Sequence, residues 1–554
     1  MYNHVLLITR LLVMAAGFSV LTACGGGSSD PAPDPDPPVV VTPLPDPKTE
    51  VDPSGAAAFL NRATFGATVD SINALVASNL EDWLDDQYQM EPTLLLPYIQ
   101  GLEEEEIYPG HRVEGWWKNV VNGEDQLRQR VAFALSEIFV ISDRNDFLFG
   151  QQEGMAHYYD MLALNAFGNY RDLLEQVTLH PAMGVYLSML GNEKPDPENN
   201  IRPDENYARE VMQLFSIGLV ELNLDGTPVL DGQGKPIPTY DQSIIEGFAH
   251  VFTGWTFTGA RYFRWPEPNM LEPMQAWASF HDTGEKHIIS NVVIPAGQTA
   301  EEDMAMALDA LFNHPNVGPF ISYRLIQRLV TSNPSPAYVA RVASVFNDNG
   351  DGERGDLGAV IKAILLDNEA INGYEISPQT FGKLREPLIR VAHQFRVTNA
   401  KTASGDIPFG WPEYVFGQSP QRAPSVFNFF SPDYQQPGEI ADADLYAPEF
   451  QLSTANNLTG MHNAVIYFTF WSTDAGNNDD PFILDIDQYI AMADTHSHLV
   501  DELNLVFMSD QMSDEMRTAI IDYLDLIDSY TTDRNKVLEV IFLILTSSEY
   551  AIQK

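Results

Sequence analysis

The chain has a single cysteine, Cys24, in 554 residues, and it is also poor in positive charge. One cysteine cannot form an intramolecular disulfide, nor can it supply the thiolates of a cysteine-based zinc or iron–sulfur site. Lysine and arginine total 31 against 77 aspartates and glutamates, which gives a formal net charge of -46. Because so acidic a surface repels phosphate backbones, we expect no nucleic acid partner.

Long apolar runs are missing after the first 24 residues. Leu11–Val20 is an apolar run of about ten residues, too short to span a bilayer but typical of a signal peptide, and Arg10 precedes it. The next residues, Leu21-Thr22-Ala23-Cys24, resemble the bacterial lipobox. The resemblance implies cleavage before Cys24, diacylation of its sulfur and stable anchoring in a membrane. The alternative is that Cys24 is an incidental residue of a short apolar helix.

Residues 24–53 predict a linker rather than part of a folded domain. The segment starts with Gly and Ser and continues with alternating Pro and Asp, a composition of flexible and then extended spacers. We therefore expect a signal peptide at 1–23, a linker at 24–53 and one domain at 54–554. The residue after the cysteine is Gly25 and not Asp. By resemblance to sorting in two-membrane bacteria, this implies the outer membrane. The periplasmic face and the cell surface both stay open.

Hydrophobic periodicity predicts a mainly α fold: one large helical domain with a small insert of β-hairpins and loops. The insert is indicated by turn signals at Asn223–Gly226 and Asp231-Gly232 and by few helical patterns in 256–296. An ordered, irregular loop is expected at 398–447. Helices are predicted at 56–65, 69–89, 125–142, 156–166, 170–190, 204–218, 241–253, 302–312, 317–331, 336–347, 357–367, 381–397, 486–507, 512–528 and 533–552.

Ten ordered segments resemble the bacterial "domain of unknown function 1800" family, and together they cover roughly residues 56–554. The segments are FLNRATFGAT (59–68), LRQRVAFALSEIFV (127–140), AFGNYRDLLEQVTLHPAMGVYLS (166–188), DENYAREVMQLFSIGLVELN (204–223), FAHVFTGWTF (248–257), FHDTGEKHII (280–289), ISYRLIQRLV (321–330), NDNGDGERGDLGAVIKAIL (347–365), APSVFNFFSP (423–432) and LILTSSEYAIQ (543–553).

The resemblance implies a largely helical envelope or secreted protein, and it brings no activity with it. It also implies a partner, since such proteins are often encoded beside a second group that looks like alkaline phosphatases and sulfatases. Many members of the family carry His in the stretch that matches Leu214-Phe215-Ser216-Ile217-Gly218, and this chain has none there. A universal catalytic role for that histidine is therefore excluded here.

The helix predicted at 204–218 carries the densest set of polar side chains. Glu205 and Arg209 are four residues apart, as are Asn206 and Glu210, so each pair can interact on the helix surface. In a functional interpretation, Glu205 and Glu210 act as general acid, general base or metal ligands, and Arg209 orients an anionic substrate. In a structural interpretation, the same groups are ion pairs and caps that fix the helix.

Two further segments suggest a site for a divalent metal ion. Glu246 and His250 have the spacing of two ligands on one helix face, and His281, Asp282 and His287 surround a predicted turn. Brought together, they would form an oxygen and nitrogen site for a metal, or His281 and Asp282 would form a base and its orienting carboxylate. A hydrogen-bonded surface pair and a polar turn are the structural alternatives.

The segment from Asn347 resembles the first half of a calcium loop, because oxygen-bearing residues alternate and Gly352 is sixth. The required bidentate Glu is missing, since the twelfth position is Gly358. Asp356 could replace it only if the loop wrapped differently, and its alternative role is to cap the helix predicted at 357–367. The candidate calcium ligands are Asn347, Asn349, Asp351, Glu353 and Asp356.

The chain lacks a Gly-x-Ser-x-Gly elbow, a phosphate-binding loop and a dinucleotide fingerprint, so serine hydrolase and nucleotide functions have no support in the sequence. We expect an exported envelope lipoprotein that acts as an accessory or scaffold protein and binds a partner protein or surface polymer. The alternative is a metal-assisted envelope hydrolase that uses the His281/Asp282/His287 loop and the Glu205/Glu210 helix. Whether the protein is an enzyme stays open at this point.

Overall fold

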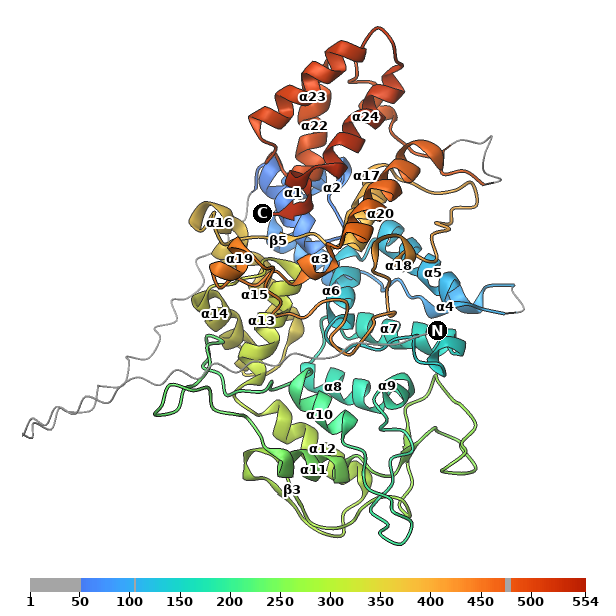
Figure 1. Cartoon of the computed structure of the whole chain (residues 1–554), viewed down its shortest axis with the longest axis vertical. Coiled ribbons are helices and arrows are strands. Elements are labelled where there is room, and N and C mark those ends of the chain that lie inside the picture. Colours follow the sequence, from blue (N-terminus) through green and yellow to red (C-terminus); the bar gives the residue numbers. More distant parts are fainter. Residues whose placement is uncertain (1–50, 104–105, 474–479) are drawn as a thin grey trace, which may run out of the picture. The chain divides into compact units, whose positions relative to one another are not determined.

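The computed structural model describes residues 51–103, 106–473 and 480–554. Cys24, the predicted signal peptide and the linker up to residue 50 lie outside the described residues. The prediction of a mainly α fold is confirmed, because helices dominate the described part and its strands are two residues long (Figure 1). None of the described helices is both long and apolar enough to cross a bilayer.

The helices follow one another along the described chain with short connections. The first nine are α1 (Pro53–Ala63), α2 (Val69–Val76), α3 (Leu80–Gln89), α4 (Leu96–Gln100), α5 (Pro109–Asn122), α6 (Gln126–Ser136), α7 (Gln152–Leu164), α8 (Tyr170–Leu179) and α9 (Pro181–Tyr186). The middle of the chain forms α10 (Asn206–Gln213), α11 (Gln242–Val251), α12 (Ala300–Phe312), α13 (Val317–Leu329), α14 (Pro336–Asn347), α15 (Leu357–Leu366), α16 (Asn368–Ile376) and α17 (Pro387–Val397). The last part forms α18 (Glu413–Phe416), α19 (Glu439–Asp442), α20 (Ala455–Ile466), α21 (Asp487–Ile490), α22 (His496–Met508), α23 (Asp514–Ile527), α24 (Asp533–Thr546) and α25 (Ser548–Ala551).

Several predicted helices are divided in the structure, and local capping explains where. The helix predicted at 69–89 is α2 and α3, because the Asn79 side chain accepts a hydrogen bond from the backbone N–H of Asp82 and starts a new helix. The helix predicted at 170–190 is α8 and α9, where the His180 side chain caps a helix that begins with Pro181. The predicted start at 381 is wrong: Glu386 precedes Pro387 and is extended, so α17 begins only after it.

The strands form three antiparallel pairs in the described residues. They are β1 (Trp255–Thr256) with β2 (Gln275–Ala276), β3 (Lys286–His287) with β4 (Val293–Ile294), and β5 (Lys383–Leu384) with β6 (Ile552–Gln553). The first two pairs lie in the predicted loop-rich insert, which confirms its β character. The third pair joins the end of the described chain to the segment before α17.

Residues 219–239 form a small structure that we call the arm. Three extended runs pair through the isolated bridges Val220↔Pro238, Leu222↔Pro228 and Leu230↔Pro236, so each run contacts the other two. The predicted turn at Asn223–Gly226 is present, with the N–H of Gly226 bonded to the carbonyl of Asn223. In the second turn, the residue with positive φ is Gly234, at φ 77°, rather than Gly232.

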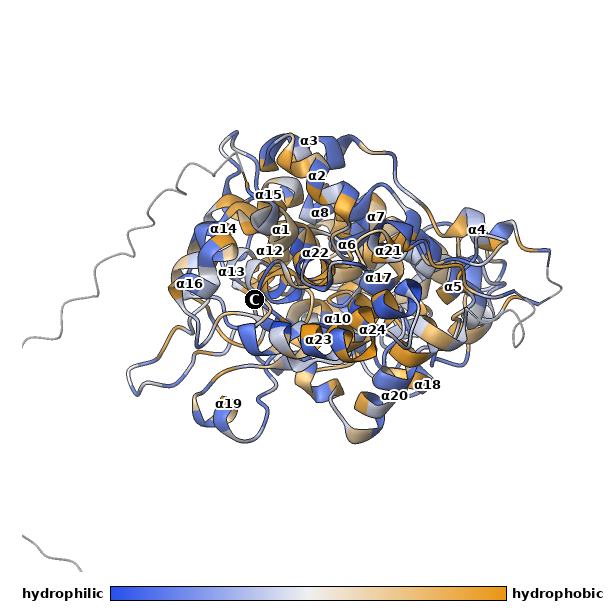
Figure 2. Cartoon of the chain, turned by 90° about the horizontal axis from the view of Figure 1, so that it is seen from above, coloured by the Kyte–Doolittle hydropathy of each residue, from blue (hydrophilic) through white to orange (hydrophobic). Residues whose placement is uncertain are grey.

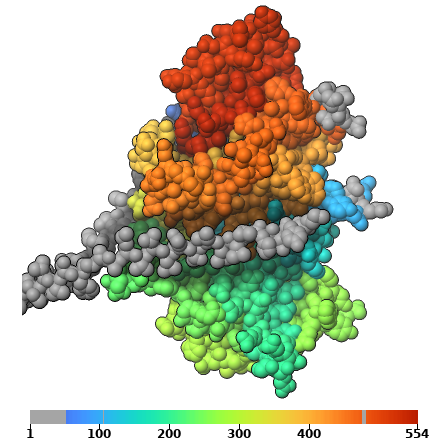
Figure 3. All heavy atoms as spheres, in the orientation of Figure 1, coloured from blue at the N-terminus to red at the C-terminus, as the bar shows by residue number. Residues whose placement is uncertain are grey.

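The interior is built from helices that are buried on most or all sides. Every residue of α6 from Gln126 to Leu135 is buried, including two arginines. Outer helices such as α2 and α3 instead carry both hydrophobic and hydrophilic residues, as Figure 2 shows. Helices α22, α23 and α24 gather at one end of the described unit, and the region from about residue 200 to 300 lies at the other (Figures 1 and 3).

Candidate functional sites

The polar side chains of α10 and α11 meet on an exposed surface. Arg209 donates to Glu205 at 3.0 Å, and Gln242 Nε2 donates to the other oxygen of Glu205, also at 3.0 Å. The same Gln242 nitrogen lies 3.5 Å from Glu246 Oε1. The structure therefore brings Glu205 and Glu246 to a shared glutamine, and the Glu205–Arg209 pair is the ion pair of the structural interpretation.

Glu210 follows Glu205 along α10 and differs from it in being buried. Its side chain is buried, burial raises the pKa of its carboxyl, and its Oε2 has no hydrogen-bond partner among the described residues. Tyr240 has a buried, unpartnered hydroxyl, and its pKa is raised to about 12, chiefly by burial, although Arg209 lowers it and Glu210 raises it. Glu205 and Glu210 thus stand in different surroundings, one at the surface and one buried.

Asp282 finds its imidazole partner in His250, not in the neighbouring His281. The Nδ1 of His250 is hydrogen-bonded to Asp282 Oδ2, and the side chains are 33% and 20% exposed. This hydrogen bond is the main reason why the pKa of Asp282 is lowered to about 2, and the N–H of Gly284 at 2.8 Å adds to it. The pair has the arrangement of a base and its orienting carboxylate on an accessible surface.

His281 belongs to the interior. Its Nε2 lies 3.0 Å from Asp303 Oδ2 and its Nδ1 lies 2.9 Å from the carbonyl of Thr253, so both ring nitrogens are engaged. Lys286 Nζ is 2.6 Å from the same Asp303 oxygen. The side chains of His281, Asp303 and Lys286 are at most 2% exposed, which identifies a buried structural cluster. His287, by contrast, is 71% exposed and pairs with Glu285 at 3.3 Å.

The metal candidates are not assembled into a metal site in the described structure. Glu246, His250, His281 and His287 occupy the separate surroundings given above. Among residues 51–103, 106–473 and 480–554, no three or more His, Cys, Asp or Glu side chains are grouped so that they could hold a metal ion.

The proposed calcium loop uses its oxygens internally. Asn349 Oδ1 accepts from the N–H groups of Asp351 and Glu353, and its Nδ2 donates to Asp356 Oδ2 at 2.7 Å. The other oxygen of Asp356 accepts from the N–H of Ala359, which makes Asp356 the N-cap of α15. Asn347 accepts from Arg354, and Glu353 accepts from Asn169 at 2.8 Å. These bonds hold the turn closed.

No sequence pattern singled out a group of six buried charged side chains in the described residues, which we call the buried ionic cluster. Arg328 lies between Glu137, whose Oε2 is 3.7 Å from its Nε, and the ring of Phe430, 4.6 Å from its guanidinium carbon. Lys383 Nζ is 2.9 Å from Glu449 and 3.9 Å from Glu386. The members are each at most 7% exposed, and they are Arg130, Glu137, Arg328, Lys383, Glu386 and Glu449.

Glu137 and Glu386 share a hydrogen bond inside this cluster. Burial is the main cause that raises the pKa of Glu137, and the charge of Glu386 raises it further. Glu137 Oε2 and Glu386 Oε1 have no other hydrogen-bond partner in the described part. A single proton held between the two carboxyls satisfies both oxygens, so we assign Glu137 as the protonated member. The cavity beside Glu137 measures about 10 Å³ and can hold one water molecule.

A groove of about 390 Å³ runs between α13, the arm and the loop that follows Pro424, and we call it the α13 groove. Its size is that of ligand sites in proteins. Leu219 and Phe427 at its rim are 56% and 46% exposed. Asn316 holds the arm in place, because its Nδ2 donates to the carbonyls of Ile217 and Val220 and its Oδ1 accepts from the N–H of Leu222. The lining includes Leu214, Leu219, Leu222, Phe320, Tyr323, Arg324, Phe427, Asp433 and Tyr446.

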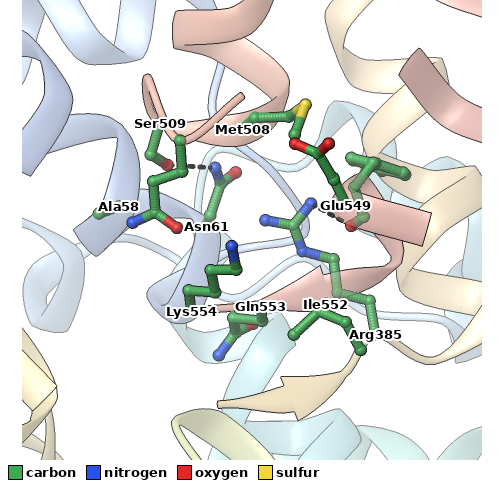
Figure 4. Close-up of a pocket in the computed structure, with 11 residues that line it drawn as sticks. Ala58, Asn61, Arg385, Met508, Ser509, Glu549, Ile552, Gln553 and Lys554 are labelled. Atoms are coloured by element: carbon green, nitrogen blue, oxygen red, sulfur yellow. Dashed lines mark hydrogen bonds between the residues drawn. The ribbon is translucent and has the colours of Figure 1, made fainter. Parts of the chain in front are cut away.

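A second pocket, near α1 and β6, is small and polar (Figure 4). Its volume of about 10 Å³ allows one water molecule. Asn61 donates to Ser509 at 3.1 Å, Arg385 donates to the carbonyls of Phe507 and Tyr550, and Glu549 accepts from Ser513. The polar groups of this pocket therefore join α1, α22 and α25 to one another.

The comparison with protein families identifies the chain. Residues 58–552 match the family described as "Protein of unknown function (DUF1800)". The chain belongs to this family. No curated protein and no solved structure matches it significantly. The resemblance drawn from the ten sequence segments is confirmed, and the DUF1800 region includes the buried ionic cluster and the α13 groove.

Proposed function

We propose that this DUF1800 protein is an accessory lipoprotein of the cell envelope that binds a segment of a partner protein in the α13 groove. The observation that carries the proposal is the groove itself. It is mostly apolar, large enough for several side chains, and rimmed by exposed Leu219 and Phe427. Exposed apolar surface of this kind is typical of sites where another molecule binds.

A protein segment fits the groove better than a surface polymer does. Leu214, Leu222 and Phe320 offer aliphatic and aromatic surface for the apolar side chains of such a segment. A net charge of -46 also repels acidic polymers at long range. The first partner to test is the group implied by the family resemblance, which looks like alkaline phosphatases and sulfatases.

The alternative of a metal-assisted hydrolase has less support. His281 is buried with both ring nitrogens engaged, and Glu205 and Glu210 differ in exposure. The hydrolase would also need a metal, and the described candidates form no metal-binding group. The groove therefore offers the better basis for a function.

Photocrosslinking tests the partner site. Benzoylphenylalanine replaces Phe427 in the groove, and in a control protein it replaces Tyr530, which is 86% exposed and lies between α23 and α24. Irradiation of intact cells should give one dominant adduct from position 427 and not from position 530. Leu219→Asp in the same chain should abolish the adduct. Equal adducts from both positions would contradict the proposal.

The lipid anchor has its own test. Cys24→Ser should release the protein from the membrane fraction, and mass spectrometry of the wild-type N-terminus should find a diacylated Cys24. An unprocessed N-terminus with a free thiol would contradict the lipoprotein assignment while leaving the groove proposal intact.

A further inference from the structure

Arg324 is a half-buried cation in the wall of the α13 groove. Its guanidinium carbon lies 5.2 Å from the ring centre of Phe320 and 5.7 Å from that of Tyr323. Its Nη1 donates to Gln327 Oε1 at 2.9 Å. These contacts hold the planar group in one orientation, with two aromatic rings beside it.

The charge of Arg324 has no direct counterion in the described structure. No ion pair joins it to a carboxylate among the described residues, and its printed side-chain partner, Gln327, is neutral. Asp433 also lines the groove and is exposed, but it acts on Arg324 only from beyond contact distance. Burial is the main cause that lowers the pKa of Arg324 to about 10, so the environment disfavours an unpaired cation.

We propose that Arg324 binds a carboxylate of the partner segment, and that this segment places the carboxylate next to an apolar side chain. The proposal rests on the proposed function, and it adds the chemistry of the ligand. Guanidinium and carboxylate form short, charge-assisted hydrogen bonds, and these strengthen where water is excluded. The neighbouring surface of Phe320 and Leu222 accepts the apolar side chain.

A single carboxylate suits the groove better than a multiply charged group. Among the described residues that line the groove, Arg324 is the one cation, Asp433 opposes a second negative charge, and the whole chain is strongly acidic. A segment of the partner can supply the carboxylate from its C-terminus or from a Glu side chain. Both sources share the same chemistry, and peptides distinguish them.

The test measures three peptides by isothermal titration calorimetry with the full chain. The first is acetyl-leucyl-phenylalanine with a free C-terminal carboxylate, and the second is the same peptide with a C-terminal amide. The third is acetyl-leucyl-phenylalanyl-glutamate with a C-terminal amide, so that its only carboxylate is the Glu side chain. We expect either acid peptide to bind at least about tenfold more tightly than the neutral amide. The stronger of the two acids identifies the C-terminal or side-chain source.

Variants assign the preference to Arg324. Arg324→Gln should reduce the preference for acid over amide to about twofold or less, while Arg264→Gln, an equal charge change at an exposed site paired with Glu193, should leave it unchanged. Asp433→Asn should strengthen binding of the acids by about twofold to threefold, because a nearby negative charge is removed. Circular dichroism checks that each variant is folded.

The outcomes separate this inference from the proposed function. Equal binding of acid and amide, or an unchanged preference in Arg324→Gln, overturns the role of Arg324 even if the position 427 adduct is found. No binding of any peptide at millimolar concentration overturns the carboxylate proposal as well. If positions 427 and 530 instead gave equal crosslinked adducts, the groove would not be the partner site.

Discussion

Two arginines one turn apart on α13 stand in opposite surroundings. Arg328 is buried, faces Glu137 and Phe430, and belongs to a cluster in which the chain supplies every carboxylate. Arg324 also lies on aromatic rings, but no described carboxylate forms an ion pair with it, and it borders an open groove. Gln327 lies between them and donates to the carbonyl of Pro432, which lines the groove.

The difference teaches how the same residue type serves binding in one turn of a helix and stability in the next turn. A buried cation whose counterion is within the chain fixes the packing of distant segments, since removing one partner leaves the other charged and buried. A desolvated cation without a counterion is an unsatisfied group that a ligand can satisfy. The predictions below test this division from the largest expected effect to the smallest.

Arg328→Met should be the most damaging of these changes. The side chain keeps a similar volume, but the ionised Glu386 loses a nearby positive charge inside the core. Removing one charge from a buried group of opposite charges in this way costs about 3–5 kcal/mol of the free energy of unfolding. Urea denaturation followed by circular dichroism measures the loss. A cost below about 1 kcal/mol would show that the cluster does not hold the core together.

Asn316→Ala should free the arm and open the groove on one side. The substitution removes three hydrogen bonds at a buried site and leaves the carbonyls of Ile217 and Val220 without their donor. We expect a loss of about 1–3 kcal/mol in the free energy of unfolding. Limited proteolysis should show faster cleavage within 219–239, and Asn223→Ala, in the exposed turn of the arm, serves as the control. Equal cleavage rates in both variants would contradict the clamp.

Glu137→Gln should change how stability depends on pH. The native state raises the pKa of Glu137 above its ordinary value of 4.5, so above pH 4.5 the unfolded chain loses this proton before the folded chain does. The raised pKa of Glu137 therefore contributes to the free energy of unfolding of the wild type. This contribution is fully present below pH 4.5 and is lost as the pH rises toward the raised pKa. Gln stays neutral, and its amide can donate to Glu386.

Denaturation curves at several pH values between 5 and 8 measure this effect. We expect the free energy of unfolding of Glu137→Gln, relative to wild type, to increase by at most about 1.4 kcal/mol per pH unit. The difference between the two proteins cancels the titration of all other groups. Parallel pH profiles would mean that Glu137 is not the protonated member of the pair.

Much of the fold could be predicted from the sequence because helix burial leaves a periodic pattern. The apolar repeat of α6 is clear, and α13, α14 and α15 lie within one or two residues of their predicted positions. α5 and α20 were not predicted: α5 begins with Pro109-Gly110, and α20 contains Gly460 among polar residues. Their helical form depends on packing against other segments rather than on their own pattern.

The sites were harder to predict because their partners are distant in the sequence. Asn428 donates to Glu137 from 291 residues away, and no local spacing shows this contact. A signal was nevertheless present: Arg130 and Glu137 lie in a strongly apolar segment, where a charged residue needs a buried partner. The spacing of Glu246 and His250 suggested a shared site, but the structure pairs His250 with Asp282 instead.

Arg324→Met should have the smallest effect on stability, and it is the sharpest comparison with Arg328→Met. The change is chemically identical and lies one turn away, but it removes a desolvated cation that has no counterion in the described chain. Lost contacts with Phe320 and Tyr323 are offset by the apolar side chain of Met, so we expect a change of less than about 1 kcal/mol in the free energy of unfolding. The same variant should lose the preference for acid peptides. If Arg324→Met were as destabilising as Arg328→Met, Arg324 would be a structural residue, and these two turns of α13 would not differ in function.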